Sequence, residues 1–127
     1  MNVIKISKEL VDSLLTERSR NTHKGDYGNI LLLCGSVGYT GAAALAAMGA
    51  LRAGAGLVYL GVPESIYAIE AVKLLEPIVM PLSDCNGMLH SGAIDKIAGL
   101  TKRMDAVLVG PGLGNSQGDI RRSALGP

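Results

Sequence analysis

The sequence predicts an α/β fold in which helices cover both faces of a mostly parallel sheet. Two observations predict this class. Apolar runs that are typical of buried strands occur at residues 29–34, 57–62 and 105–109, and segments with helical character lie between them. Strands that alternate with helices are typical of a parallel sheet with helices on both sides. The chain has 127 residues, which is the size of one domain, so we treat 1–127 as a single unit.

The expected elements follow one another with short connections. In order, they are a helix at 7–15, a strand at 29–34, a helix at 42–53, a strand at 57–62, a helix from 63 to about 75, a strand at 77–81, a turn-like stretch at 83–89, a helix at 91–100 and a strand at 105–109. Ser7 is the expected N-cap of the first helix, whose apolar side would be formed by Leu10, Val11 and Leu14. Pro63 is a typical residue for opening a helix.

The helix expected at 42–53 is built almost entirely of small and apolar residues. It carries no charge before Arg52, so we expect it to be buried nearly all round. A face of small residues would allow close packing against the sheet, with a subunit interface as the alternative. That face would consist of Ala42, Ala46, Gly49, Ala50 and Ala53.

Composition and charge exclude several classes of function. The net charge is +1, no run of Lys and Arg occurs, and the four Tyr are the only aromatic residues, so nucleic-acid binding is disfavoured. The uncharged stretch at 41–62 is interrupted by Arg52 and by the Ala-Gly pairs at 53–56, which argues against a membrane helix. Cys34 and Cys85 lack the spacing of a metal site, and Cys34 is expected as a buried thiol. We therefore expect a reducing, cytoplasmic location.

Two glycine-rich loops follow predicted parallel strands, at residues 35–41 and 110–114. The first loop, GSVGYTG, is neither a Walker A loop nor a GxGxxG fingerprint, and it precedes a helix whose free N–H groups favour an anion. A tight turn without a ligand would explain this loop equally well. Two such loops at one sheet edge favour a phosphorylated or nucleotide-like ligand. His23 would lie in a solvated loop or a charged lid, and Glu64 would serve a helix N-terminus or a ribose. His90 is expected to be exposed in a turn, and Asn115 and Ser116 would cap the next helix or point at a ligand.

Four stretches of the chain resemble one family in order: HKGDYG, GSVGYTGAAALAA, ALRAGAGLVYLGVPES and DAVLVGPGLG. They are similar to the ADP- or ATP-dependent NAD(P)H-hydrate dehydratases, which have a carbohydrate-kinase-like domain of the ribokinase-like superfamily. The resemblance covers about residues 18–114. It implies a ribokinase-like, three-layer α/β/α fold with a mostly parallel sheet.

The resemblance also implies an activity, a site and partners. The family removes water from hydrated NADH and NADPH (NADHX and NADPHX) and couples this to hydrolysis of ADP or ATP, with Mg²⁺ as an accompanying ion. Ala42 matches the family's hydrate-binding alanine, and Gly112 or Gly114 matches its second contact. The same match places Tyr39, Thr40 and Gly41 near the nicotinamide dinucleotide.

The sequence departs from the family pattern in one respect. The family's Gly-Thr-Gly-Asp motif, with its catalytic Asp, does not occur in these residues, nor does its lysine-containing nucleotide loop. We therefore expect the chain to be the N-terminal part of a ribokinase-like domain, inactive alone, with the adenine nucleotide bound mainly by a missing half. A partial sheet would leave an unpaired edge, which favours a homo-oligomer. The alternatives are a small-molecule or sugar kinase of the same superfamily and a non-catalytic nucleotide-binding assembly module.

Overall fold

The structure, a computed structural model, describes residues 3–15 and 17–115. Its centre is a four-stranded sheet in the order β3-β2-β1-β6, and all neighbouring strands are parallel. The strands are β1 (Asn29–Leu33), β2 (Leu57–Pro63), β3 (Ile78–Leu82) and β6 (Ala106–Val109). The predicted α/β class is confirmed.

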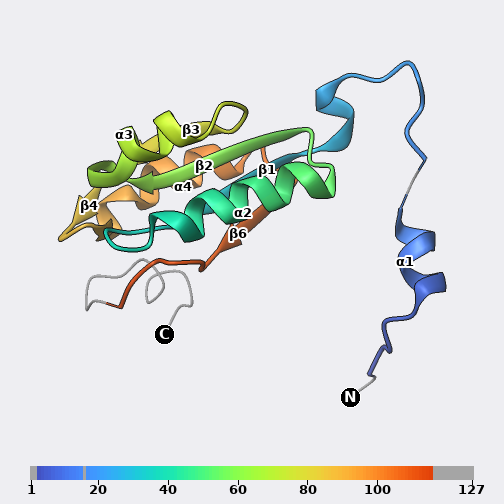
Figure 1. Cartoon of the computed structure of the whole chain (residues 1–127), viewed down its shortest axis with the longest axis horizontal. Helices are drawn as coiled ribbons and strands as arrows, with labels where there is room; N and C mark the ends of the chain where they lie inside the picture. The colour runs from blue at the N-terminus through green and yellow to red at the C-terminus, as the bar shows by residue number, and fades with distance from the viewer. Residues whose placement is uncertain (1–2, 16, 116–127) are drawn as a thin grey trace.

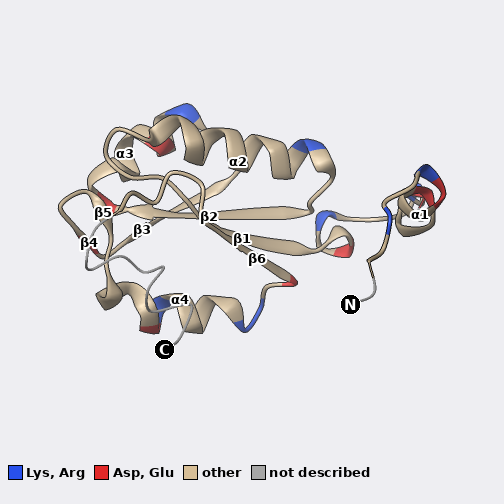
Figure 2. Cartoon of the chain, turned by 90° about the horizontal axis from the view of Figure 1, so that it is seen from below, with Lys and Arg blue, Asp and Glu red and all other residues tan. Residues whose placement is uncertain are grey.

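Helices cover both faces of the sheet, as expected. Helices α2 (Thr40–Ala53) and α3 (Glu64–Lys73) lie on one face, and α4 (Ile94–Thr101) lies on the other (Figure 2). The side chains of β1 alternate between the two cores: Leu32 packs under α2 and α3, whereas Leu31 and Leu33 pack on the opposite side. This alternation explains why β1 is a continuous apolar run.

Helix α2 begins two residues earlier than predicted and is buried along one stripe only. Ala43 and Ala47 are fully buried against the sheet, while Leu45 is 75% exposed. The expectation of a helix buried nearly all round is therefore wrong, and so is the packing of the whole small-residue face on the sheet, because Gly49 and Ala53 are exposed. The alternative, a subunit interface on this face, stays a prediction. The absence of charge was misleading, since alanine tolerates a solvent-facing position as readily as a buried one.

Strand β6 differs from the prediction in its burial. The apolar run at 105–109 was expected to be a buried strand, but all four residues of β6 are exposed. The exposed fractions of Val107, Leu108 and Val109 are 45%, 38% and 42%. The reason is the strand order, because β6 pairs with β1 on one side and forms the edge of the described sheet on the other.

The stretch at 83–89, expected to be turn-like, contains a β-hairpin. Strands β4 (Asp84–Cys85) and β5 (Met88–Leu89) pair antiparallel across Asn86 and Gly87, both of which have positive φ. Asn-Gly is the preferred pair for such a two-residue turn. The chain then continues through the 3-10 turn η2 (Ser91–Ala93) into α4.

Helix α1 (Lys8–Leu14) stands apart from the sheet (Figure 1). Ser7 caps it as predicted, since its Oγ accepts a hydrogen bond from the Leu10 amide at 3.3 Å. The predicted apolar side has no counterpart to pack on, because no residue of α1 is buried and Leu14 is 73% exposed. None of the helices in the described residues combines the length and the apolar character needed to cross a membrane.

Candidate functional site

The two glycine-rich loops meet at the carboxyl edge of the sheet, as predicted. The Gly35 amide donates to the Pro111 carbonyl at 2.8 Å, and the Ser36 hydroxyl donates to the Gly112 carbonyl at 2.7 Å. Ser36 is 1% exposed, so this second bond lies inside the protein. The loops after β1 and β6 are therefore one hydrogen-bonded unit, and not two independent turns.

Gly112 lies directly against the start of α2. A Cβ on Gly112 would stand 2.7 Å from the Cβ of Ala42 and 3.0 Å from the Cβ of Tyr39, and the residue has a φ of +69°. Both the close approach and the backbone conformation require glycine at this position. Ala42 and Gly112, one of the two glycines offered by the family resemblance as the second contact, are thus brought together.

The β4–β5 hairpin packs against both glycine-rich loops. The Val37 amide donates to the Gly87 carbonyl at 2.9 Å, and a Cβ on Gly87 would lie 2.4 Å from Val37 Cγ2. A Cβ on Gly114, which has a φ of +87°, would lie 2.5 Å from Met88 Sδ. Our sequence interpretation missed this contribution, although the Asn86-Gly87 pair was the local signal for a hairpin.

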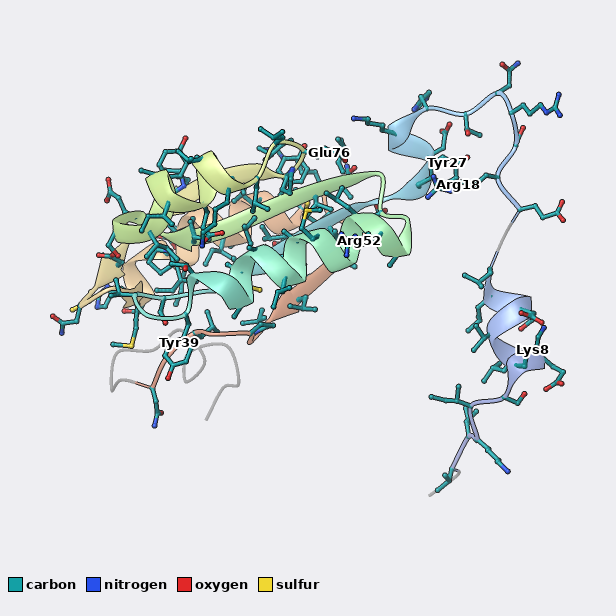
Figure 3. All side chains as sticks on the ribbon, viewed as in Figure 1. Lys8, Arg18, Tyr27, Tyr39, Arg52 and Glu76 are labelled. Carbon is teal, nitrogen blue, oxygen red and sulfur yellow. The ribbon has the colours of Figure 1, made fainter. Side chains whose placement is uncertain are left out.

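A shallow pocket of about 500 Å³ opens at this edge. It is lined by Tyr39, Gly110, Gly112, Leu113, Gly114 and Asn115. Tyr39 is 59% exposed and lies at this end of the molecule, as Figure 3 shows. Two more of the predicted site residues occupy the first turn of α2: Gly41 is exposed, and a Cβ there would meet nothing within 4 Å; Thr40 is half-buried, and its Oγ1 accepts a hydrogen bond from Lys73 at 2.9 Å.

The start of α2 gives the pocket its electrostatic character. No side chain caps the helix at Tyr39, and its first turn carries no acidic residue. The positive end of the helix dipole is therefore not neutralised locally, which favours an anionic group. Ser116, which we had considered a cap or a ligand contact together with Asn115, lies outside the described residues.

Chemistry beyond binding is not provided by the side chains around this pocket. None of its lining residues is an Asp, Glu, His, Lys or Cys. Within residues 3–15 and 17–115, no three His, Cys, Asp or Glu side chains gather to hold a metal ion. The described residues therefore identify no site for Mg²⁺, and we derive no step through it. Glu64 is exposed in the first turn of α3, which agrees with a helix N-terminal role.

Three other candidate residues lie elsewhere or serve the fold. His23 precedes β1, at the amino edge of the sheet, in a second pocket of about 440 Å³. The interpretation of His23 as part of a lid near the site is therefore wrong. Figure 3 shows Arg18 and Tyr27, which line the same second pocket, at the end of the sheet opposite Tyr39. Ligands of open parallel sheets bind at the carboxyl edge, so we assign the site to the glycine loops.

The other two are His90 and Cys34. His90, expected to be exposed, is half-buried and caps η2, because its Nδ1 accepts from the Gly92 amide at 3.1 Å. Cys34 is fully buried, as predicted, and burial raises the pKa of its thiol to about 12. A thiol in that state is a packing group and not a nucleophile.

Comparisons with known proteins identify the family of the chain. The family model for NAD(P)H-hydrate dehydratase matches residues 30–122. The chain is 38% identical over 123 residues to the bifunctional NAD(P)H-hydrate repair enzyme of Dictyoglomus turgidum, covering 95% of this chain and 24% of that protein. It is 38% identical over 112 residues to the ADP-dependent (S)-NAD(P)H-hydrate dehydratase of Streptococcus pneumoniae, covering 87% and 35%.

Solved structures give the same result. The ADP/ATP-dependent NAD(P)H-hydrate dehydratase of Bacillus subtilis, co-crystallised with ATP/Mg²⁺, superposes with a TM-score of 0.69 at 33% identity, covering 93% of this chain and 40% of that one. A ribokinase-like superfamily protein of Enterococcus faecalis, 20% identical with a TM-score of 0.69, covering 92% of this chain and 40% of that one, shows the shared fold. The chain thus spans between a quarter and two fifths of the length of these relatives. Because the family model covers most of the sequence, the chain belongs to the NAD(P)H-hydrate dehydratase family.

Proposed function

We propose that this chain forms one wall of the substrate site of an ADP/ATP-dependent NAD(P)H-hydrate dehydratase. Such an enzyme removes water from NADHX or NADPHX. The observation that carries the proposal is the contact between Ala42 and Gly112, where a Cβ on the glycine would lie 2.7 Å from Ala42 Cβ. This contact joins the two loops that the family resemblance matched to the hydrate, beside an open pocket of about 500 Å³.

The pocket has features that suit a dinucleotide. The start of α2 offers backbone N–H groups and the positive end of the helix dipole, to which a diphosphate is complementary. Tyr39 presents an exposed ring on which a nicotinamide or adenine ring could stack, and Thr40 and Gly41 continue the same turn. In this proposal Gly112 and Gly114 allow the ligand to approach the backbone closely.

We further propose that the chain does not turn over the hydrate by itself. The residues lining the pocket include no acid or base, and the sequence contains no Gly-Thr-Gly-Asp motif. In this proposal residues 1–127 are one part of a ribokinase-like domain, and the groups that bind ADP or ATP with Mg²⁺ are supplied by other residues. The choice of ADP or ATP as the nucleotide is supported by two relatives, from Streptococcus pneumoniae and Bacillus subtilis, which are named as ADP-dependent and ADP/ATP-dependent.

The substrate site is tested by titrating the purified chain with NADPHX in a calorimeter. Tyr39→Ala should weaken binding by about 10-fold, because a base stacked on an aromatic ring contributes roughly 1–3 kcal/mol. Tyr67→Ala is the matched control, since Tyr67 is a surface tyrosine of α3 that does not line the pocket. Equal affinities for both variants would contradict the assignment of the pocket. Steady ADP-dependent loss of NADPHX in the presence of this chain alone would contradict its proposed inactivity.

The exposed edge of the sheet favours a second proposal, that the chain forms a homo-oligomer. Strand β6 presents Val107, Leu108 and Val109 at 38–45% exposure beside an edge that no described strand covers. Exposed apolar edge strands pair readily with other chains. Sedimentation equilibrium over a range of protein concentrations tests this, and a monomer throughout that range would contradict it.

A further inference from the structure

An ion pair with one buried partner lies beside the first turn of α2: Glu70 is buried, whereas the Lys73 side chain is 41% exposed. The ammonium of Lys73 donates to Thr40 Oγ1 at 2.9 Å and stands 3.5 Å from Glu70 Oε1. The Glu70 side chain is completely buried, and its second oxygen, Oε2, has no hydrogen-bond partner in the described part of the chain. The two residues come from α3, so the contact ties that helix to the first residue of α2.

Stability does not explain this arrangement. A buried carboxylate with one unpartnered oxygen is unfavourable, and apolar residues of similar size would serve the packing at least as well. The ammonium also lies at the start of α2, where the positive end of the helix dipole repels a cation. The first turn of α2 itself offers no acidic residue to offset that repulsion, so the compensation comes from α3, through Glu70 and through the negative end of the α3 dipole, where Lys73 lies. A role in the function of this turn would explain why a buried carboxylate with an unpartnered oxygen is kept beside it.

We infer that Glu70 and Lys73 are positioning residues for the substrate site: Glu70 holds the Lys73 ammonium, and Lys73 holds the Thr40 hydroxyl. Thr40 lies between Tyr39 and Ala42, which contact Gly112 on the pocket side. The first turn of α2 is therefore held by two contacts: the hydrogen bond from Lys73 of α3 to Thr40, and the packing of Gly112 of the second glycine loop against Ala42. The inference rests on the proposed function, because it assigns the pair to the site for a phosphate-bearing dinucleotide.

The inference predicts that loss of the tie loosens the turn and weakens dinucleotide binding. Two measurements on the full chain test it: hydrogen–deuterium exchange of the segment 37–45 without ligand, and NADPH affinity from the fluorescence of its reduced nicotinamide. Lys73→Met and Thr40→Val should each raise exchange and weaken NADPH binding by about 10-fold, the effect of losing one charge-assisted hydrogen bond. The double variant should add little, because both changes remove the same contact.

Conservative variants separate positioning from general destabilisation. Lys73→Arg and Thr40→Ser keep the donor and the acceptor, so they should restore both values to near those of the wild type. Glu70→Gln keeps an acceptor but loses the charge that anchors Lys73, so it should give a smaller effect than Lys73→Met. Lys102→Met is the matched control, since Lys102 is exposed at the end of α4, and it should change neither measurement.

The outcomes distinguish this inference from the proposed function. Unchanged exchange in Lys73→Met would overturn the positioning role whether or not NADPH binds. Raised exchange with unaltered NADPH affinity would overturn it too, because the turn would then position nothing for the ligand. If the wild-type chain fails to bind NADPH while exchange responds as expected, the proposed function is overturned and the tie between Lys73 and the first turn of α2 is supported.

Discussion

Replacing Gly112 with alanine tests the close approach of the second glycine loop to the start of α2. The variant has two separable effects: it places an L-residue at a φ of +69°, and it adds a methyl group 2.7 Å from Ala42 Cβ. Two other glycines separate these effects. Gly38 has a φ of +87°, but a Cβ there would meet nothing within 4 Å, so Gly38→Ala has the backbone effect alone. Gly49 lies inside α2 with open space around it and has neither effect.

The expected free energies of unfolding follow from these geometries. Gly49→Ala should stabilise the protein by about 0.5–1 kcal/mol, because glycine is a poor residue inside a helix. Gly38→Ala should destabilise it by about 1–2 kcal/mol through its left-handed backbone. Gly112→Ala should add about 1–3 kcal/mol for forcing a methyl group into a packed contact, for a total loss of roughly 2–5 kcal/mol.

Urea unfolding followed by far-UV circular dichroism measures all three variants, since the chain has no tryptophan to report by fluorescence. The difference between Gly112→Ala and Gly38→Ala isolates the contact with Ala42 and Tyr39. Adding Ala42→Gly to the Gly112→Ala chain should recover part of this difference, because it removes the nearest atom. If Gly112→Ala is no more destabilising than Gly38→Ala, the close approach of the two loops is not the constraint that we infer.

Four further predictions concern other parts of the structure. At pH 8 a thiol reagent should modify one cysteine of the folded chain, the exposed Cys85, and two after unfolding, because burial raises the pKa of Cys34 to about 12. The thiol of unfolded Cys34 has a pKa near 9, whereas burial raises the pKa of the folded thiol to about 12. Between these two pH values the free energy of unfolding of the wild type should fall by about 1.4 kcal/mol per pH unit relative to Cys34→Ala, measured by urea unfolding as a function of pH. Val107→Lys should shift sedimentation profiles toward the monomer, because it places a charge on the exposed β6 edge. Asp84→Ala should destabilise the protein by about 0.5–2 kcal/mol in thermal unfolding, because Asp84 Oδ2 accepts from the Ser65 amide at the start of α3, and an equal effect of Asp95→Ala would contradict this.

The sheet and its functional edge could be predicted because they depend on local patterns. Each apolar run identifies a strand, and parallel strands place the loops that follow them at one edge. The order of the strands across the sheet depends on pairing between segments far apart in the sequence, which local patterns do not reveal. The burial predicted for β6 was wrong because this order places β6 at the edge of the described sheet. An apolar run looks the same whether its strand lies inside the sheet, as β1 does, or at its edge. The Asn86-Gly87 hairpin was a local signal that a composition-based interpretation of the turn overlooked.

The contacts that complete the site could not be predicted from spacing. Thr40 and Lys73 are 33 positions apart, and Ser36 and Gly112 are 76 apart. Nothing in either segment identifies its partner. The resemblance selected Ala42 and either Gly112 or Gly114 as separate matches, and the contact of Ala42 with Gly112 emerges only when α2 and the loop after β6 are placed against the same end of β1.

The composition of α2 now has a physical explanation that a single small-residue face could not give. Successive residues of a helix point about 100° apart, so Ala42 and Ala43 face different neighbours. Ala43, together with Ala47, packs on the sheet, while Ala42 meets Gly112 of the second glycine loop. Small side chains are therefore required on two adjacent faces at the start of the helix: one for close packing on the sheet and one for the contact with the second glycine loop. Our prediction placed only one small-residue face on this helix, whereas in the structure the adjacent residues Ala42 and Ala43 make two different contacts.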